Sequence, residues 1–151
     1  MRRKDCEITD RAEIDAILDE ALVCRIGLAD DGEPYVVPFS FGYDHDAVYL
    51  HSALEGKKIA ILEKNPRCCF ETDICDRLVQ GDRPCSWGMH YRSVIGYGTA
   101  EILKDPDEKR HGLNCIMRHY GGSTHGFSES DLGSVAVIRI AIESMTGKKH
   151  D

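Results

Sequence analysis

Two neighbouring lysines that follow a glycine are the residues whose types and spacing point most directly to binding chemistry. Lys57 and Lys58 come directly after Gly56, where an amphipathic helix is predicted to begin, and Ser52 lies shortly before them. A helix N-terminus offers unpaired N–H groups and a partial positive charge, which suit a phosphate, and two ammonium groups with a hydroxyl add charge and donors. The pattern therefore predicts a phosphate site. The alternative is an ordinary solvated helix face.

His51 directly precedes this group at the end of a predicted strand. Histidine is the side chain whose charge changes near neutral pH, so His51 is the candidate proton donor of any chemistry beside the phosphate. A histidine that only packs against a ligand or a strand is the alternative.

A second group of chemically capable residues lies at positions 85–93, and it contains Trp87, the only tryptophan. A lone tryptophan usually packs in a core or an interface, but the neighbours of Trp87 are polar. Arg92 and Ser93 follow at the start of a long predicted strand. The nearby Gly96-Tyr97-Gly98 lies inside that strand and is only Gly-x-Gly, so it is no dinucleotide fingerprint.

Seven cysteines occur in the chain, and no two of them form a Cys-x-x-Cys pair. An odd count without a secretory signal indicates reduced thiols rather than a disulfide framework. A zinc site formed by the four cysteines at positions 68–85 is the alternative, but adjacent residues of a strand point to opposite faces. We therefore expect structural or incidental thiols and no metal site. Cys24 and Cys69 are expected to be core thiols rather than redox partners.

Three helices are predicted around these residues. Asp10 followed by Glu13 resembles a capping box at the start of a helix over residues 10–20. Apolar residues at helical spacing after Gly56 predict a short helix that ends at Asn65-Pro66. Asp105-Pro106 opens a third helix that runs to about Tyr120 and is stopped by two glycines.

The remaining segments have strand character, and Asp31-Gly32 between two apolar runs predicts a hairpin. A bulge or bend is predicted at Gly96 and Gly98, a loop at 77–85 and a flexible segment at 123–130. Short hairpin-linked strands with helices at the ends indicate a mainly β, antiparallel barrel or sandwich. The predicted strands are Ala21–Ala29, Pro34–Tyr43, Ala47–His51, Arg67–Asp73, Tyr91–Leu103 and Val135–Ile142.

Composition limits the class of protein. The 151 residues, 42% of them apolar, suffice for one domain over 1–151, and the formal charge of −7 argues against a nucleic-acid partner. No apolar run approaches the about 20 residues of a membrane span, and no signal peptide is recognisable at the N-terminus. We expect a cytoplasmic, single-domain protein without a membrane partner.

The order of several short motifs resembles the flavin-binding family related to pyridoxamine 5′-phosphate oxidase, and within it the nitroimidazole-resistance branch. The motifs are Val37-Pro38-Phe39-Ser40-Phe41-Gly42-Tyr43, Val48-Tyr49-Leu50-His51-Ser52-Ala53, Gly56-Lys57-Lys58, Asn65-Pro66-Arg67 and the run from Ser93 to Glu101. The resemblance covers about residues 5–147. It implies a six-stranded antiparallel split β-barrel, a homodimer, and FMN bound at the subunit interface.

The resemblance also implies roles for individual residues. The strand from Val37 through Pro38, Phe39 and Ser40 to Phe41 would run along the flavin ring. His51 and Ser52 would lie near the ribityl chain and phosphate, and Lys57 and Lys58 would hold the phosphate. Arg92 and Ser93 would approach the cofactor from the next long strand, and Trp87 belongs to a Ser-Trp-Gly stretch typical of this branch.

The chain departs from the true oxidase at several positions. Val36 and Phe41 stand where the oxidase carries an arginine and a lysine, and its C-terminal basic residues have no clear match in Ile142–Asp151. We therefore do not expect a vitamin B6 enzyme. The expected function is an FMN-dependent oxidoreductase that passes electrons to a small acceptor, for which nitroaromatic compounds are candidates. The alternatives are a flavin carrier or sensor, and a haem-binding split barrel in which His51 or His90 binds iron.

Overall fold

The computed structural model describes residues 4–124 and 126–150. Two of the predicted helices begin at aspartate caps: the side chain of Asp10 accepts the Ala12 N–H, and that of Asp105 accepts the N–H groups of Asp107 and Glu108. The α-helices are α1 (Arg11–Glu20), α2 (Lys57–Lys64), α3 (Pro106–His119) and α4 (Glu129–Ser134), with 3₁₀ turns at Lys4–Cys6 and Pro84–Ser86. Within the described residues, no helix is both long and apolar enough to cross a bilayer.

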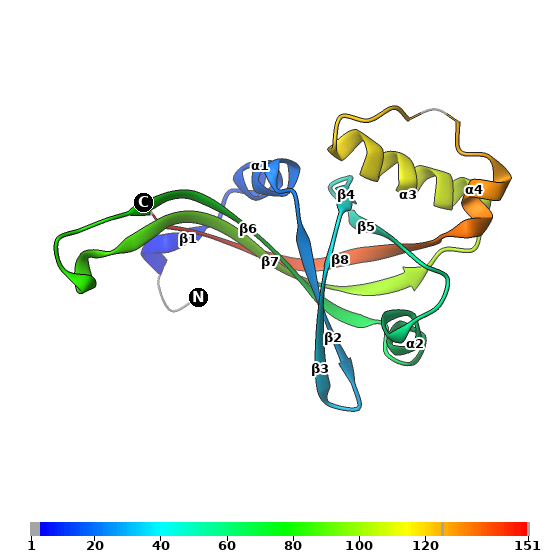
Figure 1. The fold of residues 1–151 in the computed structure, drawn as a ribbon, viewed down its shortest axis with the longest axis horizontal. Helices are drawn as coiled ribbons and strands as arrows, with labels where there is room; N and C mark the ends of the chain where they lie inside the picture. The colour runs from blue at the N-terminus through cyan, green and yellow to red at the C-terminus, as the bar shows by residue number, and fades with distance from the viewer. Residues whose placement is uncertain (1–3, 125, 151) are drawn as a thin grey trace.

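All strands belong to one antiparallel sheet with the order β3-β2-β6-β7-β8-β5-β4, and β1 pairs with β8. The strands are β1 (Glu7–Ile8), β2 (Cys24–Asp30), β3 (Glu33–Phe39), β4 (Phe41–Tyr43), β5 (Ala47–Ser52), β6 (Arg67–Val79), β7 (Gly88–Ile102) and β8 (Ala136–His150). The sheet is strongly curled (Figure 1). This confirms the mainly β class and the split-barrel architecture.

The expected count of six strands is wrong, since the described residues form eight. The predicted strand Pro34–Tyr43 is divided at Ser40 into β3 and β4, which lie at opposite edges of the sheet. β1 has only two residues, too few to show an alternating pattern.

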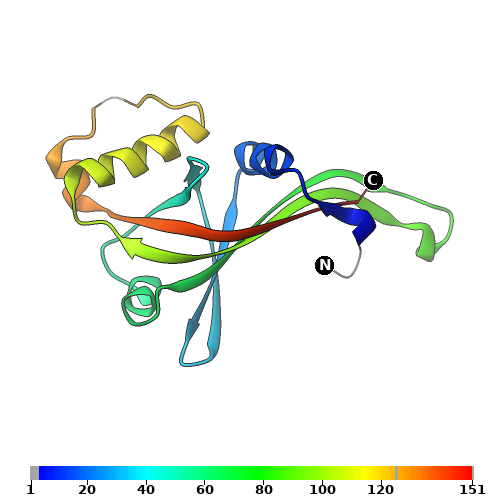
Figure 2. The same cartoon turned by 180° about the vertical axis from the view of Figure 1, so that it is seen from behind.

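The last three long strands extend further than predicted. β6 continues to Val79, so the predicted loop at 77–85 is shorter, β7 begins at Gly88, and β8 continues to His150. The added strand ends are polar, and they are held by backbone hydrogen bonds to the neighbouring strand rather than by burial of apolar side chains. A hydrophobicity pattern therefore does not predict them. The hairpin end of β6 and β7, residues 74–92, projects from the body as an arm (Figures 1 and 2).

Two apolar clusters divide the interior. The larger one fills the concave side of the sheet and includes Val48 and Leu50 of β5 together with residues of α1 and α2. The smaller one lies on the other face of β5 and β8, where Tyr49 and Val137 pack against α3 and α4. β5 therefore buries both of its faces, one under each cluster.

Other local predictions have mixed outcomes. The three predicted helices are confirmed, and the register shift between Tyr97 and Gly98 confirms the bulge. Glu13 does not close a capping box, because its carboxylate pairs with Lys149 at 2.7 Å. α4 was not predicted: its Ser128 cap and Asp131 form a real capping box, but the helix has only six residues and overlaps the segment predicted as flexible. Residue 125 of that segment lies outside the described residues.

Gly42 of β4 sets how closely α3 approaches the sheet. A Cβ at this position would lie 2.4 Å from the Ile116 nitrogen and 2.5 Å from the Cys115 carbonyl carbon, both backbone atoms. Gly42→Ala must therefore displace α3, and we expect a loss of about 1–3 kcal/mol of stability, measured as a Tm decrease of several degrees. Gly27→Ala is the matched strand control, because its added Cβ meets neighbours at an ordinary 3.7 Å. Equal Tm values for both variants would contradict the close-packing explanation.

Candidate functional site

The first turn of α2 lies against β3. The ammonium nitrogen of Lys57 is 4.7 Å from the centroid of the Tyr35 ring, and that of Lys58 is 5.6 Å from the Phe39 ring. Among the described residues, no carboxylate lies within ion-pair distance of either lysine. The two positive charges are therefore held by aromatic faces and remain available to an anion.

The N-terminus of α2 is open. Its cap residue Gly56 supplies no side chain to bond the first N–H groups and has a φ of +132°, a conformation that favours glycine. A Cβ at Gly56 would meet nothing within 4 Å. The first N–H groups of α2 thus have no side-chain cap, and the space beside Gly56 is open next to two lysines, as an anion site requires.

Ser52 is the buried polar residue of this region. It is only 7% exposed, and its hydroxyl oxygen has no hydrogen-bond partner. A buried hydroxyl without a partner costs free energy, so such an atom in a folded protein points to a missing ligand or water. The structure thus brings Ser52 to the end of β5 that leads into the α2 N-terminus.

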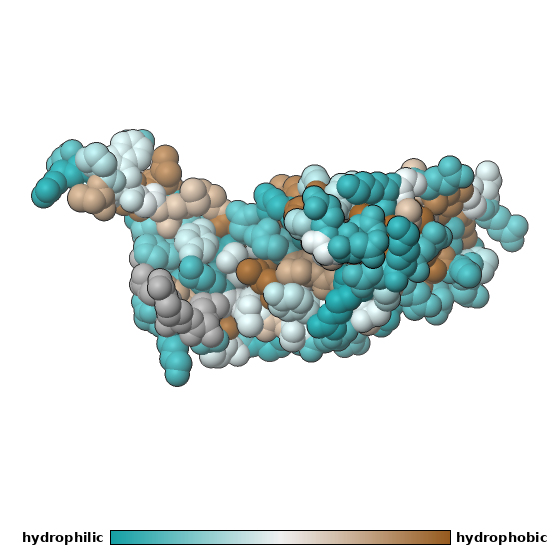
Figure 3. Space-filling model, turned by 90° about the horizontal axis from the view of Figure 1, so that it is seen from below, coloured by the Kyte–Doolittle hydropathy of each residue, from teal (hydrophilic) through white to brown (hydrophobic). Residues whose placement is uncertain are grey.

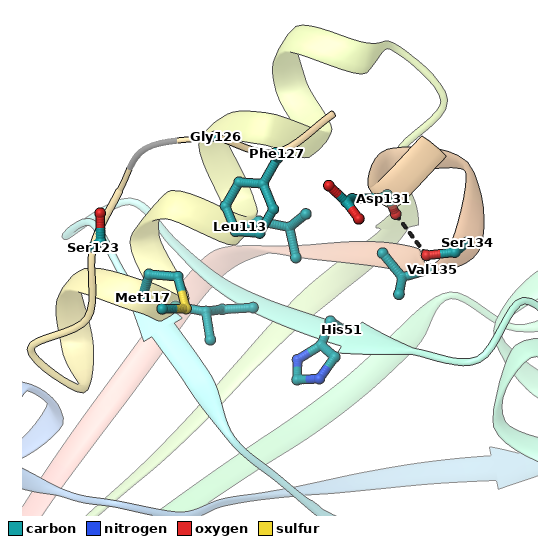
Figure 4. Close-up of a pocket in the computed structure, with 10 residues that line it drawn as sticks. His51, Leu113, Met117, Ser123, Gly126, Phe127, Asp131, Ser134 and Val135 are labelled. Atoms are coloured by element: carbon teal, nitrogen blue, oxygen red, sulfur yellow. Dashed lines mark hydrogen bonds between the residues drawn. The ribbon is translucent and has the colours of Figure 1, made fainter. Parts of the chain in front are cut away.

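His51 belongs to a different surface. Successive strand residues point to opposite faces, so His51 lies on the face of Tyr49, whereas Ser52 lies on the face of Val48 and Leu50. His51 is exposed and lines a cavity of about 590 Å³. In Figure 4, residues of α3, of the segment before α4 and of α4 stand around the space beside His51.

The cavity wall is mainly apolar. Leu113, Ile116 and Met117 come from α3, and Phe127 and Val135 flank α4. Asp131 is the acidic residue of the wall, but its carboxylate accepts both the N–H and the hydroxyl of Ser128. The cavity thus offers room for a small, mainly apolar molecule beside the imidazole of His51. The sequence prediction missed this wall because α4 and the preceding segment carry no long periodic pattern.

The segment from Val37 to Phe41, predicted to run along a flavin ring, differs in exposure from residue to residue. β3 lies at the sheet edge, and its side chains alternate: Val37 and Phe39 are half-buried, whereas Pro38 and Ser40 are exposed. Phe41 is fully buried in the larger core cluster, and its N–H donates to the Tyr120 hydroxyl at 3.1 Å. Phe41 is therefore already engaged, while β3 keeps one edge unpaired in the described part of the chain.

Arg92, Ser93 and Trp87 are remote from the lysines within this chain. Arg92 and Ala100 both lie on β7, roughly 25 Å apart along the strand. The Ala100 N–H donates to the carbonyl of Pro66, which follows α2 closely, so Arg92 is far from the end of β7 that lies near α2. Its guanidinium pairs with Asp76 at 2.6 Å and with Glu20 at 2.9 Å, and these hydrogen bonds raise its pKa. Trp87 is 53% exposed on the arm. The structure thus places Trp87 and Arg92 on the arm and Ser93 at its base, away from α2 (Figure 1).

The cysteines occupy varied surroundings. Cys24 and Cys68 are buried, and desolvation raises the pKa of each thiol to about 12, which disfavours the reactive thiolate. Cys69 is half-buried, and Cys75 and Cys85 are exposed. The four cysteines at positions 68–85 thus range from the interior of the sheet to the arm.

Comparisons with known proteins show the family and the fold of the chain. The family described as pyridoxamine 5′-phosphate oxidase matches residues 10–149. A Bacteroides thetaiotaomicron protein, described as a candidate 5-nitroimidazole antibiotic resistance protein, is 38% identical; the match covers 95% of this chain and 86% of that one, with a TM-score of 0.85. No curated protein matches the chain.

Other solved structures are similar at lower identity. A FAD-binding protein from Mesorhizobium loti is 27% identical over 94% of this chain and 96% of its own, with a TM-score of 0.69. A FAD and heme binding protein from Mycobacterium smegmatis is 20% identical over 96% of this chain and 73% of its own, with a TM-score of 0.86. This last likeness is one of fold.

The buried hydroxyl of Ser52 provides a test of the site that does not depend on activity. In ligand-free protein, Ser52→Ala removes a hydroxyl that has no partner, so we expect unchanged stability or a gain of up to about 1 kcal/mol. Thr72→Val is the matched control: Thr72 is equally buried, but its hydroxyl donates to the Val23 carbonyl at 2.9 Å. That variant should lose about 1 kcal/mol. Urea unfolding measures both, and a clear loss in Ser52→Ala would show that its hydroxyl is already satisfied by the protein.

Proposed function

The chain belongs to the pyridoxamine 5′-phosphate oxidase family, and we propose that it is an FMN-binding flavoprotein that reduces a small acceptor, with nitroaromatic compounds as the first class to test. The observation that carries this proposal is the anion site at α2. Within the described residues, neither Lys57 nor Lys58 has a carboxylate partner, no side chain caps the helix N-terminus, and the Ser52 hydroxyl is buried without a partner. A phosphate monoester satisfies all three.

The edge strand β3 beside the phosphate site suits the isoalloxazine ring of such a cofactor. The unpaired edge of β3 next to the lysines offers backbone groups to the ring, from Val37 to Ser40, while the aromatic rings of Tyr35 and Phe39 hold the ammonium groups in place. The flavin supplies the electron-transfer chemistry, and the protein supplies binding, orientation and electrostatics. Phe41 acts as a core residue that fixes the end of this strand.

His51 is the proposed proton donor. It is the exposed histidine of the 590 Å³ cavity, and the next residue along β5 is Ser52 of the phosphate site. An acceptor bound in the cavity would lie between the apolar wall of α3 and the imidazole. His51 would then deliver a proton to the acceptor as it receives electrons.

A homodimer is part of the proposal. The arm exposes Leu78, Trp87 and Met89, and Figure 3 shows apolar side chains on this projecting segment at the upper left of the view. Clustered exposed apolar side chains mark interaction surfaces. In a dimer, the arm of the partner would bring Trp87, Arg92 and Ser93 toward a cofactor that they do not reach within one chain.

Two other functions remain as alternatives. A flavin carrier or sensor would use the same phosphate site without turnover. Haem binding is suggested by the names of two neighbours, the Mycobacterium smegmatis protein and a flavocytochrome from Azotobacter vinelandii that is 23% identical over all of this chain and 72% of its own, with a TM-score of 0.84. It would require His51 or His90 as an iron ligand. The mass of the cofactor released on denaturation distinguishes FMN, FAD and haem.

Removal of both lysines tests the phosphate site. We expect the Lys57→Ala/Lys58→Ala variant to bind FMN at least tenfold more weakly, because two charge-assisted contacts to the phosphate are lost. Titration of apoprotein with FMN and with riboflavin measures the effect, which should be confined to FMN. Lys64→Ala, on the last turn of the same helix and paired with Asp30, is the control. Equal FMN affinity in the double variant and the wild type would contradict the assignment of Lys57 and Lys58 to the phosphate site.

Turnover tests the role of His51. The flavin is reduced anaerobically and its reoxidation by a 5-nitroimidazole is followed by absorbance. We expect His51→Asn to keep its flavin and to slow reoxidation by about 10²–10⁴-fold, the usual contribution of a general acid. His45→Asn, an exposed histidine that pairs with Asp15, should react as the wild type does. A wild type that reoxidises no faster than buffer alone would support the carrier function instead.

A further inference from the structure

Three metal-ligating side chains converge beneath α3, apart from the proposed flavin site. They are Asp44 from the turn between β4 and β5, and His111 and Cys115 from α3. One ligand atom of each, a carboxylate oxygen, an imidazole nitrogen and the thiol sulfur, lies within 4.8 Å of the other two. Cys115 is buried, Asp44 is half-buried and His111 is exposed, so the group lies at the edge of the smaller core cluster.

Backbone geometry fixes the positions of these three residues. His111 and Cys115 are four positions apart and therefore lie on the same face of the helix. Asp44 is held by its other carboxylate oxygen, Oδ1, which accepts the N–H groups of Asp46 at 3.2 Å and Ala47 at 2.9 Å. Its Oδ2 is thereby turned toward His111. Close packing of α3 on Gly42 brings the helix within reach of the turn.

A single imidazole nitrogen faces both partners. His111 Nε2 lies 3.1 Å from Asp44 Oδ2 and 3.5 Å from Cys115 Sγ. One proton on Nε2 can be donated along only one of these directions. A tetrahedral zinc ion with bonds of about 2.0–2.3 Å separates its ligand atoms by roughly 3.3–3.7 Å, so both distances are close to those of ligands that share one metal ion.

We propose that Asp44, His111 and Cys115 form a binding site for a divalent cation of the zinc class. Thiolate, imidazole and carboxylate are the donors that Zn²⁺ prefers, and water or solvent would complete the tetrahedron. His111 is exposed and also lines a cavity of about 220 Å³, so solvent reaches this side of the site. The sequence alone does not indicate this site, because its three residues are brought together only by the packing of α3.

At the thiol, one contact competes with the metal. A guanidinium nitrogen of Arg118 lies 3.0 Å from Cys115 Sγ, and burial raises the pKa of this thiol. The raised pKa favours the neutral thiol, whereas a bound metal would favour the thiolate, because coordination deprotonates a thiol. Arg118 is exposed, so its side chain can turn to solvent when the metal binds. Its positive charge should nevertheless lower the affinity.

The site would tie α3 to the turn that begins β5. α3 also carries Leu113, Ile116 and Met117, which line the cavity beside His51. A metal on the opposite side of the helix would therefore fix the wall of that cavity without touching its contents. This effect on the cavity rests on the proposed function, whereas the metal site itself does not.

Cobalt(II) is the probe for the test, with the untagged full-length chain in reduced form. We expect one equivalent of Co²⁺ to bind with a thiolate-to-metal charge-transfer band and tetrahedral d–d bands, and to be displaced by Zn²⁺. Cys115→Ala should abolish the charge-transfer band, and His111→Gln should weaken binding by at least about 100-fold, beyond the usual cost of losing an outer-shell partner. Cys75→Ala, which removes an exposed thiol elsewhere, should behave as the wild type does.

Arg118→Gln distinguishes a metal site from a simple thiol–guanidinium contact. If the metal occupies the site, removal of the competing charge should tighten Co²⁺ binding several-fold. Absence of stoichiometric binding in both the wild type and Arg118→Gln, or a charge-transfer band that survives in a folded Cys115→Ala, would overturn the proposal. Because each readout is metal binding, flavin content does not affect the result, and a failure of the flavin proposal remains distinguishable.

Discussion

The architecture depends on one short connection, the single residue Ser40 between β3 and β4. These two strands lie at opposite ends of the strand order, so the sheet must curl until its edges come within one residue of each other. The curl encloses the larger core cluster, and among the described strands only β2 pairs with β3, so its other edge is unpaired there. Pro34 and Pro38 suit such an edge, because proline cannot donate to a neighbouring strand. The feature that closes the barrel therefore also creates the surface offered to the proposed cofactor.

The alternation of β5 then divides the proposed chemistry between two sides. Ser52 faces the core and the region of α2, whereas His51 faces the cavity under α3. Two consecutive residues can thus act in binding and in proton transfer without competing for the same space. The division holds only because β5 is covered on both faces, by the larger cluster on one side and by α3 on the other. Gly42 allows α3 to come close enough for that cover.

Local signals in the sequence predicted much of this fold. Asp10, Asp105 and Pro106 act within one helical turn, so they mark helix starts without any knowledge of the sheet. Ser40 could not be recognised as a break, because the apolar pattern continues through it and only the curl of the whole sheet separates β3 from β4. Lys57, Lys58 and Ser52 were predictable as a set since all three lie within one strand–helix connection. The wall around His51 and the cluster of Asp44, His111 and Cys115 depend on how α3 packs, which spacing along the chain does not reveal.

In the proposed dimer, the arm would affect both the stability of the protein and the set of residues around the cofactor. β8 supports β7 only as far as Tyr91, so the rest of the arm is a two-stranded ribbon, and such ribbons are marginal in water. This ribbon nevertheless exposes Trp87 and Leu78, which a second copy could bury. Meanwhile Arg92 has its charge neutralised by Glu20 and Asp76, so in one chain it braces the base of the arm rather than a ligand. In the proposed dimer, burial of the ribbon would supply the free energy that positions the arm, and the same contact would close the cofactor site. Cofactor binding and association would then be thermodynamically linked, each strengthening the other.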